Sequence, residues 1–65
     1  MEEKIIHALT ECPDGLRLRV LAWCIGENPK YVLPKLHEME DSGKIVTVIY
    51  HDPANMEYFT RYKLA

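Results

Sequence analysis

Two cysteines, three histidines and ten acidic residues are the side chains that could carry catalysis or hold a metal in this chain. Eleven residues separate Cys12 from Cys24, and no histidine stands at zinc-ligand spacing from either of them. The acidic residues are scattered over charged stretches, and no glycine-rich phosphate loop is present. The sequence therefore predicts no metal site, no cofactor and no enzyme activity.

The charges between residues 28 and 42 could instead serve in binding a polyanion. Among the Lys, His, Asp and Glu side chains of this stretch, those in the first part are all basic and those in the second part are all acidic: Lys30, Lys35 and His37, then Glu38, Glu40 and Asp41. Acids at the end of a helix oppose its macrodipole by a few tenths to about 1 kcal/mol, so helix stability does not account for their position. Two interpretations stay open, a surface polarised for binding and a solvated face that keeps the protein soluble.

Length and composition limit the possible classes of protein. A chain of 65 residues, of which 48% are apolar, predicts one folded domain over residues 1–65. The formal charge of −2 provides no general attraction to nucleic acid, so any such binding depends on where the basic residues lie. No apolar run reaches the roughly 18 residues of a transmembrane helix, and the start MEEKII lacks the basic region of a secretory signal. We expect a cytoplasmic protein.

Apolar residues recur at helical spacing in three segments. The first predicted helix spans residues 2–12, and the turn formed by Pro13–Gly15 leads to Leu16, expected as a single extended residue or very short strand. The second begins at residue 17 or 18 and ends at residue 25, with Gly26 as its left-handed C-cap. The expected inward side chains are Ile5, Leu9 and Cys12, then Leu18, Leu21, Ala22 and Ile25, then Val32, Leu36 and Met39.

The third predicted helix has Asn28 as its N-cap and Pro29 at its first position, where proline is favoured. Pro34 then falls inside the helix, where proline removes one hydrogen bond and costs about 3 kcal/mol. Either the helix begins only near Leu33, with Pro34 at its first position, or it keeps its register and bends, with its first turn tightened. We favour the second possibility because Val32, Leu36 and Met39 are in phase.

From Lys44 the apolar period changes from that of a helix to that of a strand. Residues 44–50 and 56–64 are rich in β-branched and aromatic side chains and predict a hairpin whose turn is residues 51–55. Tyr62 is expected in the core, and Tyr50 and Tyr58 are expected to face each other across the two strands. A lone hairpin is only marginally stable, so it must pack on the helices.

Three helices followed by a β-hairpin resemble the winged helix-turn-helix family, of the type found in bacterial and phage transcription regulators. The residues that carry the resemblance stand at the family's spacing for core, turn and cap: Leu21, Ala22, Ile25, Gly26, Asn28, Val32, Leu36, Met39, Gly43 and Ile45, with Tyr62-Lys63-Leu64 at the end of the hairpin. The resemblance covers nearly the whole chain and identifies no subfamily. It implies an α+β fold with three helices and a two-strand wing.

The resemblance also implies a small sequence-specific DNA-binding transcriptional regulator. In this family the second helix of the motif, here about residues 29–42, enters the major groove, and the wing, with its tip at 51–55, reaches the neighbouring backbone. The implied contacts with double-stranded DNA are Arg17 and Arg19 on phosphate, Asn28, Lys30, Tyr31 and Lys35 on the reading face, His51 and Asn55 at the wing tip, and Arg61 and Lys63 on its return strand. The alternative is a winged-helix protein-interaction module that does not bind DNA.

The second helix carries an additional apolar stripe, formed by Val20, Trp23 and Cys24. A helix that is apolar nearly all round is usually buried on more than one side. Two explanations stay open. The first helix covers Trp23, or Val20 and Trp23 form an interface with a second copy of the chain or another protein, since tryptophan is frequent at interface hot spots.

Overall fold

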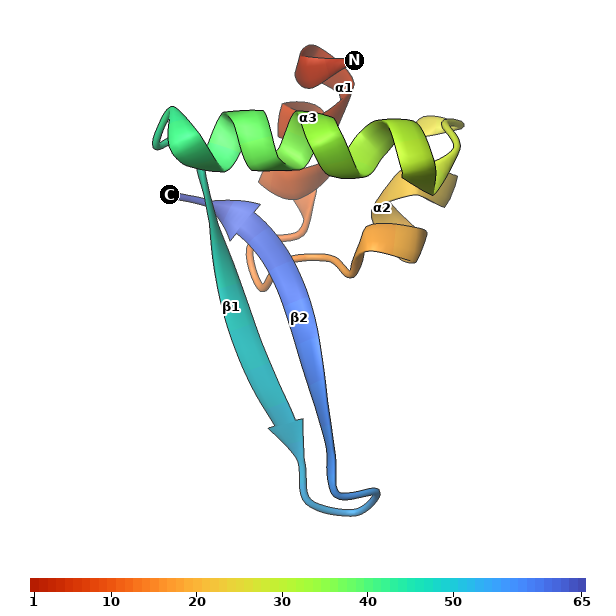
Figure 1. The fold of residues 1–65 in the computed structure, drawn as a ribbon, viewed down its shortest axis with the longest axis vertical. Helices are drawn as coiled ribbons and strands as arrows, with labels where there is room; N and C mark the ends of the chain where they lie inside the picture. The colour runs from red at the N-terminus through yellow and green to blue at the C-terminus, as the bar shows by residue number, and fades with distance from the viewer.

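The computed structural model describes all 65 residues, which form three helices and one β-hairpin (Figure 1). The elements in chain order are α1 (Glu2–Glu11), α2 (Leu18–Ile25), α3 (Pro29–Asp41), β1 (Ile45–Asp52) and β2 (Glu57–Leu64). The helices gather at one end of the molecule, and the antiparallel hairpin extends away from them as a long arm. This α+β order of elements is the winged-helix arrangement, and it confirms the predicted fold.

One cluster of nine buried side chains joins the helices to the hairpin. The helices contribute Ile5, Leu9, Leu21, Ala22, Val32, Leu36 and Met39, and the hairpin contributes Ile45 and Tyr62. Three side chains expected in the core are only partly buried, namely Cys12, Leu18 and Ile25. Because Ile45 and Tyr62 come from the root of the hairpin, the helical body supports the root and leaves the distal half in solvent.

The turn at residues 13–15 connects α1 to the hairpin. α1 ends just before Cys12, one residue earlier than predicted, because the following proline disfavours helix at that position. Leu16 exchanges two backbone hydrogen bonds with Tyr62, at 2.9 and 2.8 Å, and is the predicted very short strand. Gly15 has φ +91° and lies so close to β2 that an added Cβ would come within 2.9 Å of the Tyr62 carbonyl oxygen. This position therefore requires glycine.

A glycine cap and an asparagine cap build the tight turn between α2 and α3, as predicted. Gly26 adopts the left-handed conformation with φ +73°, and the Glu27 N–H donates to the Ala22 carbonyl at 3.0 Å. The side-chain oxygen of Asn28 accepts a hydrogen bond from the Lys30 N–H at 3.0 Å. The two caps fix where α2 ends and α3 begins, and so which residues occupy the first turn of α3.

α3 runs from Pro29 to Asp41 as one helix with Pro34 inside it. The favoured register of α3 is therefore correct, and a helix start near Leu33 is excluded. Pro34 has no N–H to donate to the Lys30 carbonyl, which would be its partner in a regular helix. Its ring lies on the exposed side of the helix, so the core stripe of α3 is undisturbed.

β1 reaches two residues further toward the tip than predicted, whereas β2 begins at Glu57, one residue later than predicted. His51 and Asp52 belong to β1, and the turn is confined to residues 53–56. The Asp52 carboxylate accepts hydrogen bonds from the Ala54 N–H and the Asn55 side-chain amide, both at 2.9 Å. These bonds close the turn immediately after Asp52 and so set the register of the two strands.

The register places Tyr50 opposite Phe59 and His51 opposite Tyr58. The predicted pair of Tyr50 with Tyr58 is therefore wrong, because that pair needs a turn centred on Ala54, whereas the observed turn is centred half a residue later. Side chains alternate between the two faces of a sheet, so Tyr50 and Phe59 share one face, and His51 and Tyr58 share the other. This alternation decides which side chains of the wing can act together.

Candidate nucleic-acid interface

The first turn of α3 presents Lys30 and Tyr31 to solvent. The Asn28 cap holds the Lys30 backbone, and the Lys30 ammonium lies 5.2 Å from the centre of the Tyr31 ring. The Tyr31 side chain is 58% exposed, which excludes a packing role in the core. The structure thus brings together three of the residues expected on the reading face, at the positive end of the helix dipole.

The outward face of α3 is defined by the residues opposite its buried stripe. Val32, Leu36 and Met39 are buried, and the exposed residues on the other side follow one another at helical spacing: Lys30, Pro34, His37 and Asp41. The N-terminal part of this face is basic and its C-terminal end is acidic. The polarity predicted from the sequence is therefore present on the exposed surface.

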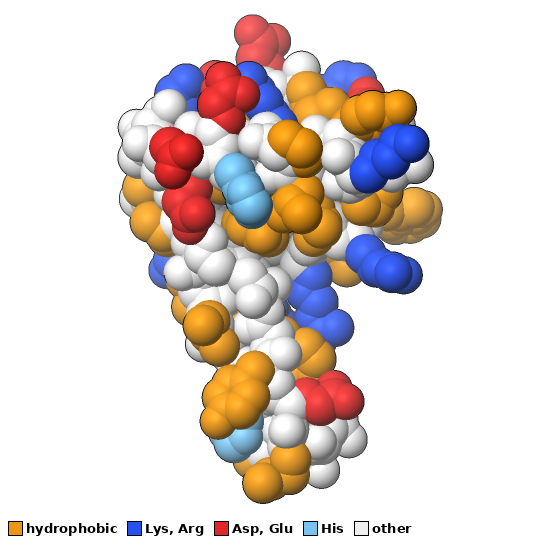
Figure 2. Space-filling model, viewed as in Figure 1, with side chains coloured by type: hydrophobic (Ala, Val, Ile, Leu, Met, Phe, Trp, Pro, Cys, Tyr) orange, Lys and Arg blue, Asp and Glu red, His pale blue; other side chains and the backbone are white.

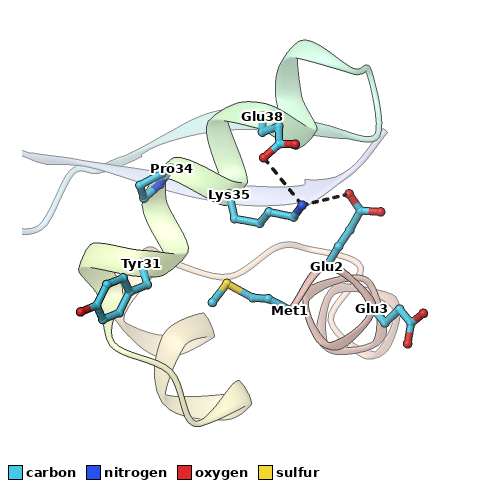
Figure 3. A pocket seen from close by; sticks show the side chains of 7 residues that line it. All are labelled: Met1, Glu2, Glu3, Tyr31, Pro34, Lys35 and Glu38. Carbon is cyan, nitrogen blue, oxygen red and sulfur yellow. Dashed lines mark ion pairs between the residues drawn. The ribbon is translucent and has the colours of Figure 1, made fainter.

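Lys35 does not belong to the outward face, and its placement there was wrong. The Lys35 ammonium lies 3.8 Å from one Glu2 carboxylate oxygen and 3.7 Å from a Glu38 carboxylate oxygen (Figure 3). These groups line a groove of about 700 Å³ between the start of α1 and α3, which also includes Tyr31 and Pro34. Because Lys35 directly precedes the buried Leu36, its side chain flanks the core stripe and turns toward α1.

Two arginines stack on neighbouring aromatic rings of the wing. The Arg17 guanidinium lies 3.6 Å from the centre of the Phe59 ring, and the Arg61 guanidinium lies 4.7 Å from the centre of the Tyr50 ring. The Tyr50 hydroxyl donates to the Asp14 carbonyl at 3.1 Å, which anchors this face of the wing to the turn after α1. Stacking on the rings holds both guanidinium groups in place while they keep their charge.

The other expected wing contacts are not part of this group. The His51 ring stacks on Tyr58, with centroids 4.7 Å apart, and both lie on the face opposite Arg61. The Asn55 amide is engaged by Asp52 within the turn, and Lys63 is a half-buried residue near the root. The structure therefore places His51 on the opposite face and Asn55 in the turn, whereas Lys63 lies two residues from Arg61 on the same face of β2.

The face of the wing that carries His51 is largely apolar at its distal end. Ile49 is 68% exposed and Tyr58 is 72% exposed on this face. Only His51 on this face was predicted to have a functional role, although its two-residue spacing from Ile49 indicates that the two side chains share a face. No Lys or Arg lies on this face, so it offers nothing that would attract phosphate.

On the face drawn in Figure 2, acidic and basic side chains gather at different places around α3. Figure 2 shows acidic side chains over the C-terminal end of α3, and basic side chains that follow the other edge from the N-terminal end of α3 toward the wing. We call the exposed or half-buried basic residues of this edge the basic edge: Arg17, Arg19, Lys30 and Arg61. The chain has a net charge of −2, so this local excess of positive charge is a property of the arrangement.

Trp23 lies beside the basic edge and is 84% exposed. The explanation in which α1 covers Trp23 is therefore wrong, because α1 packs on the other side of α2 through Ile5 and Leu9. Trp23 and Arg19 line one hollow of about 350 Å³, and Val20, also exposed, lines another of about 300 Å³ with Arg17. Trp23 and Val20, three residues apart on α2, are thus neighbouring exposed apolar side chains.

Two ionisable groups have shifted pKa values, and both lie outside the basic edge. The hydrogen bond and ion pair with Lys44, at 2.9 Å, and the charge of Lys35 lower the pKa of the Glu2 carboxyl below 4.5. Burial raises the pKa of the Tyr62 hydroxyl above 10.0, and the nearby Glu40 carboxylate adds to this shift. Both shifts stem from contacts that hold α1, α3 and the hairpin together.

Comparison of the chain with known protein families, curated proteins and solved structures found no match. No helix in the structure has the length and apolar character needed to cross a membrane. No group of three or more His, Cys, Asp or Glu side chains is placed to hold a metal ion. The case for a function therefore depends on the fold, the basic edge and the exposed side chains beside it.

Proposed function

We propose that this chain is a small DNA-binding transcriptional regulator of the winged helix-turn-helix family that acts in the cytoplasm. The observation that carries the proposal is the separation of charge around α3 (Figure 2). Basic side chains line the N-terminal end of α3 and the root of the wing, and acidic side chains occupy the opposite end. A winged helix presents this N-terminal part of its recognition helix and its wing to the duplex.

Arg17, Arg19 and Arg61 would bind backbone phosphates on either side of the groove entered by α3. A guanidinium group offers a planar set of donors suited to phosphate oxygens, and stacking on Phe59 and Tyr50 limits the motion of two of them. The dipole of α3 adds positive potential at the same end. Neutralising phosphates releases counterions, so the binding would weaken steeply with salt.

Lys30 and Tyr31 would supply contacts inside the groove. A lysine ammonium can donate to the acceptor atoms of guanine in the major groove, and the exposed Tyr31 hydroxyl can donate or accept. Asn28 uses its side-chain oxygen to cap α3, so only its amide group is available to DNA. Pro34 and His37 continue the same face, and Asp41 marks where the contact with a polyanion would end.

The test measures binding of fluorescently labelled duplexes of mixed sequence as a function of salt. For Arg61→Ala we expect weaker binding and a salt slope smaller in magnitude by about 1 unit, the effect of one lost phosphate contact. Lys35→Ala should change the slope less than Arg61→Ala, since Lys35 is held by Glu2 and Glu38. Lys4→Ala is the matched control, because it removes one exposed charge from α1. Absence of salt-dependent binding to any duplex at low ionic strength would refute the proposal.

A second candidate function, a protein-interaction module that binds no DNA, is favoured by one observation, the exposure of Trp23. Trp23 and Val20 form an apolar surface on α2 beside Arg19, which suits a protein partner with an apolar contact and a carboxylate at its rim. Trp23→Ser would then abolish partner binding while the salt-dependent binding of DNA, if present, persists. The same DNA titration thus separates the two candidates.

A further inference from the structure

The outer edge of β1 has no neighbouring strand. β2 lies between β1 on one side and Leu16 on the other, and the sheet contains no further strand beside β1. Below the level of the helices, Figure 1 shows no other element next to β1. The distal part of β1 therefore offers a row of backbone groups to solvent, which is a template for pairing with another strand.

The hydrogen bonds of β2 identify which residues of β1 point outward. Tyr62 uses its N–H and its carbonyl for Leu16, so Tyr62 and its partner Thr47 form a pair without hydrogen bonds between them. Antiparallel pairs alternate between bonded and non-bonded, so the backbone groups of Thr47, Ile49 and His51 point away from β2. The bond from the Ala65 N–H to the Lys44 carbonyl, at 3.2 Å, fits the same alternation.

β1 lacks the features that usually protect an exposed edge. It has eight residues paired in continuous register with no bulge, contains no proline, and has no charged residue from Ile45 to Tyr50. Exposed edge strands are normally short, bulged, or interrupted by lysine or proline. Two of the four exposed side chains on β1 are moreover apolar, namely Val46 at the root and Ile49 further out, and the other two are Thr47 and His51. Such an edge is suited to pairing with another strand.

We propose that β1 pairs with β1 of a second copy of this chain, antiparallel about a two-fold axis at Val48, to form a four-stranded sheet. A two-fold pairing uses the same edge on both copies and closes on itself, so it produces a dimer. The two helical bodies then lie at opposite ends of the shared sheet. This dimer does not depend on DNA binding and goes beyond the proposed function.

The axis at Val48 follows from the register. It places Thr47 opposite the partner's Ile49. The backbone N–H and C=O groups that point away from β2 in one copy then face the same groups of the other copy on both sides of the axis. Val46 comes opposite the partner's Tyr50, and Lys44 opposite the partner's Asp52, so no like charges face each other. An axis at Ile49 would instead place Val46 opposite the partner's Asp52. The Val48 register is therefore favoured because it pairs Lys44 with the partner's Asp52 and places no charge opposite an apolar side chain.

The experiment combines sedimentation velocity with amide hydrogen exchange by NMR over a range of protein concentrations. We expect a monomer–dimer equilibrium, with the amides of Thr47, Ile49 and His51 exchanging fast in dilute protein and protected in concentrated protein. The amides of Val46 and Val48 should be protected throughout, because they bond β2. A chain that stays monomeric at every concentration overturns the proposal, and so does a dimer in which the three outward amides remain unprotected.

Two variants place the same charge on either strand of the same face. Ile49→Lys adds a lysine to the open edge, and Tyr58→Lys adds one to β2, where the wild-type side chain is similarly exposed. We expect Ile49→Lys to weaken dimerisation by about tenfold or more and Tyr58→Lys to leave it nearly unchanged. Circular dichroism of both variants checks that the hairpin is retained. Equal effects of the two variants would refute pairing at the edge.

Discussion

Lys30 and Lys35 have the same charge on the same helix, yet only Lys30 is free to meet a ligand. Their places follow from helix geometry, because Lys30 is opposite the buried stripe and Lys35 flanks it. The exposure of Lys30 could be predicted from the Asn28 cap and the core spacing. The pairing of Lys35 with Glu2 could not, because it depends on how α1 packs against α3.

The pKa of Glu2 leads to a prediction on the pH dependence of stability. Because the contact with Lys44 lowers this pKa in the folded chain, the contact stabilises the fold above the ordinary value of 4.5, and the contribution is lost as the pH falls through the lowered pKa. We expect Glu2→Gln to be less stable than the wild type at neutral pH and equal to it in acid. Urea unfolding at a series of pH values measures the difference.

Glu3→Gln is the matched control for this pH series. Glu3 is the next residue on α1, is exposed, and forms no ion pair. Its substitution should give a free-energy difference from the wild type that changes little with pH. If the difference for Glu2→Gln stayed constant from neutral pH into acid, the ion pair would not be the cause of its stability effect.

At the scale of elements, caps and core spacing predicted the helices well, while the tip of the hairpin was misplaced. The helix boundaries are set by local residues such as Gly26 and Asn28, whose chemistry is legible in sequence. The strand register depends on which turn Asp52 closes, and the stretch from residue 51 to 55 allows several turns. One residue of register moves the side chains of one strand to the other face relative to its partner, so the cross-strand partner of His51 could not be predicted.

Pro34 provides a prediction for α3. An interior proline removes one helical hydrogen bond, so Pro34→Ala should raise the free energy of unfolding, by up to about 3 kcal/mol. Urea unfolding measures the gain. His37→Ala, at an exposed position of the same helix, corrects for the helix propensity of alanine and should give less than about 1 kcal/mol. A loss of stability in Pro34→Ala would mean that the ring makes contacts worth more than the missing bond.

At the scale of the whole molecule, the candidate surfaces lie in two regions. The basic edge and the exposed Trp23 adjoin each other on α2, and the open edge of β1 lies on the hairpin. The sequence predicted the first two as candidate surfaces because they involve marked residue types. It could not predict the open edge, because a free strand edge is a property of the assembled sheet and not of any residue.

The exposure of Trp23 predicts that Trp23→Ser changes stability little. Truncating a tryptophan covered by α1 would lower the free energy of unfolding by several kcal/mol. Truncating an exposed one should change it by less than about 0.5 kcal/mol. Urea unfolding tests this, and sedimentation of the same variant tests the dimer. We expect the dimer to persist, since Trp23 is not on β1. A shift of Trp23→Ser toward monomer would assign self-association to α2 instead.

Gly15 has a consequence for how such a protein can evolve. Any side chain there would meet the Tyr62 carbonyl and the β-carbons of Arg61 and Lys63, so the joint between body and wing admits no stepwise variation. A lineage adapting to a new binding site could not retune the wing angle by small changes at this point. Substitutions that alter binding would have to fall in the turn at residues 53–56 and on the exposed face of α3, while Gly15 would be retained.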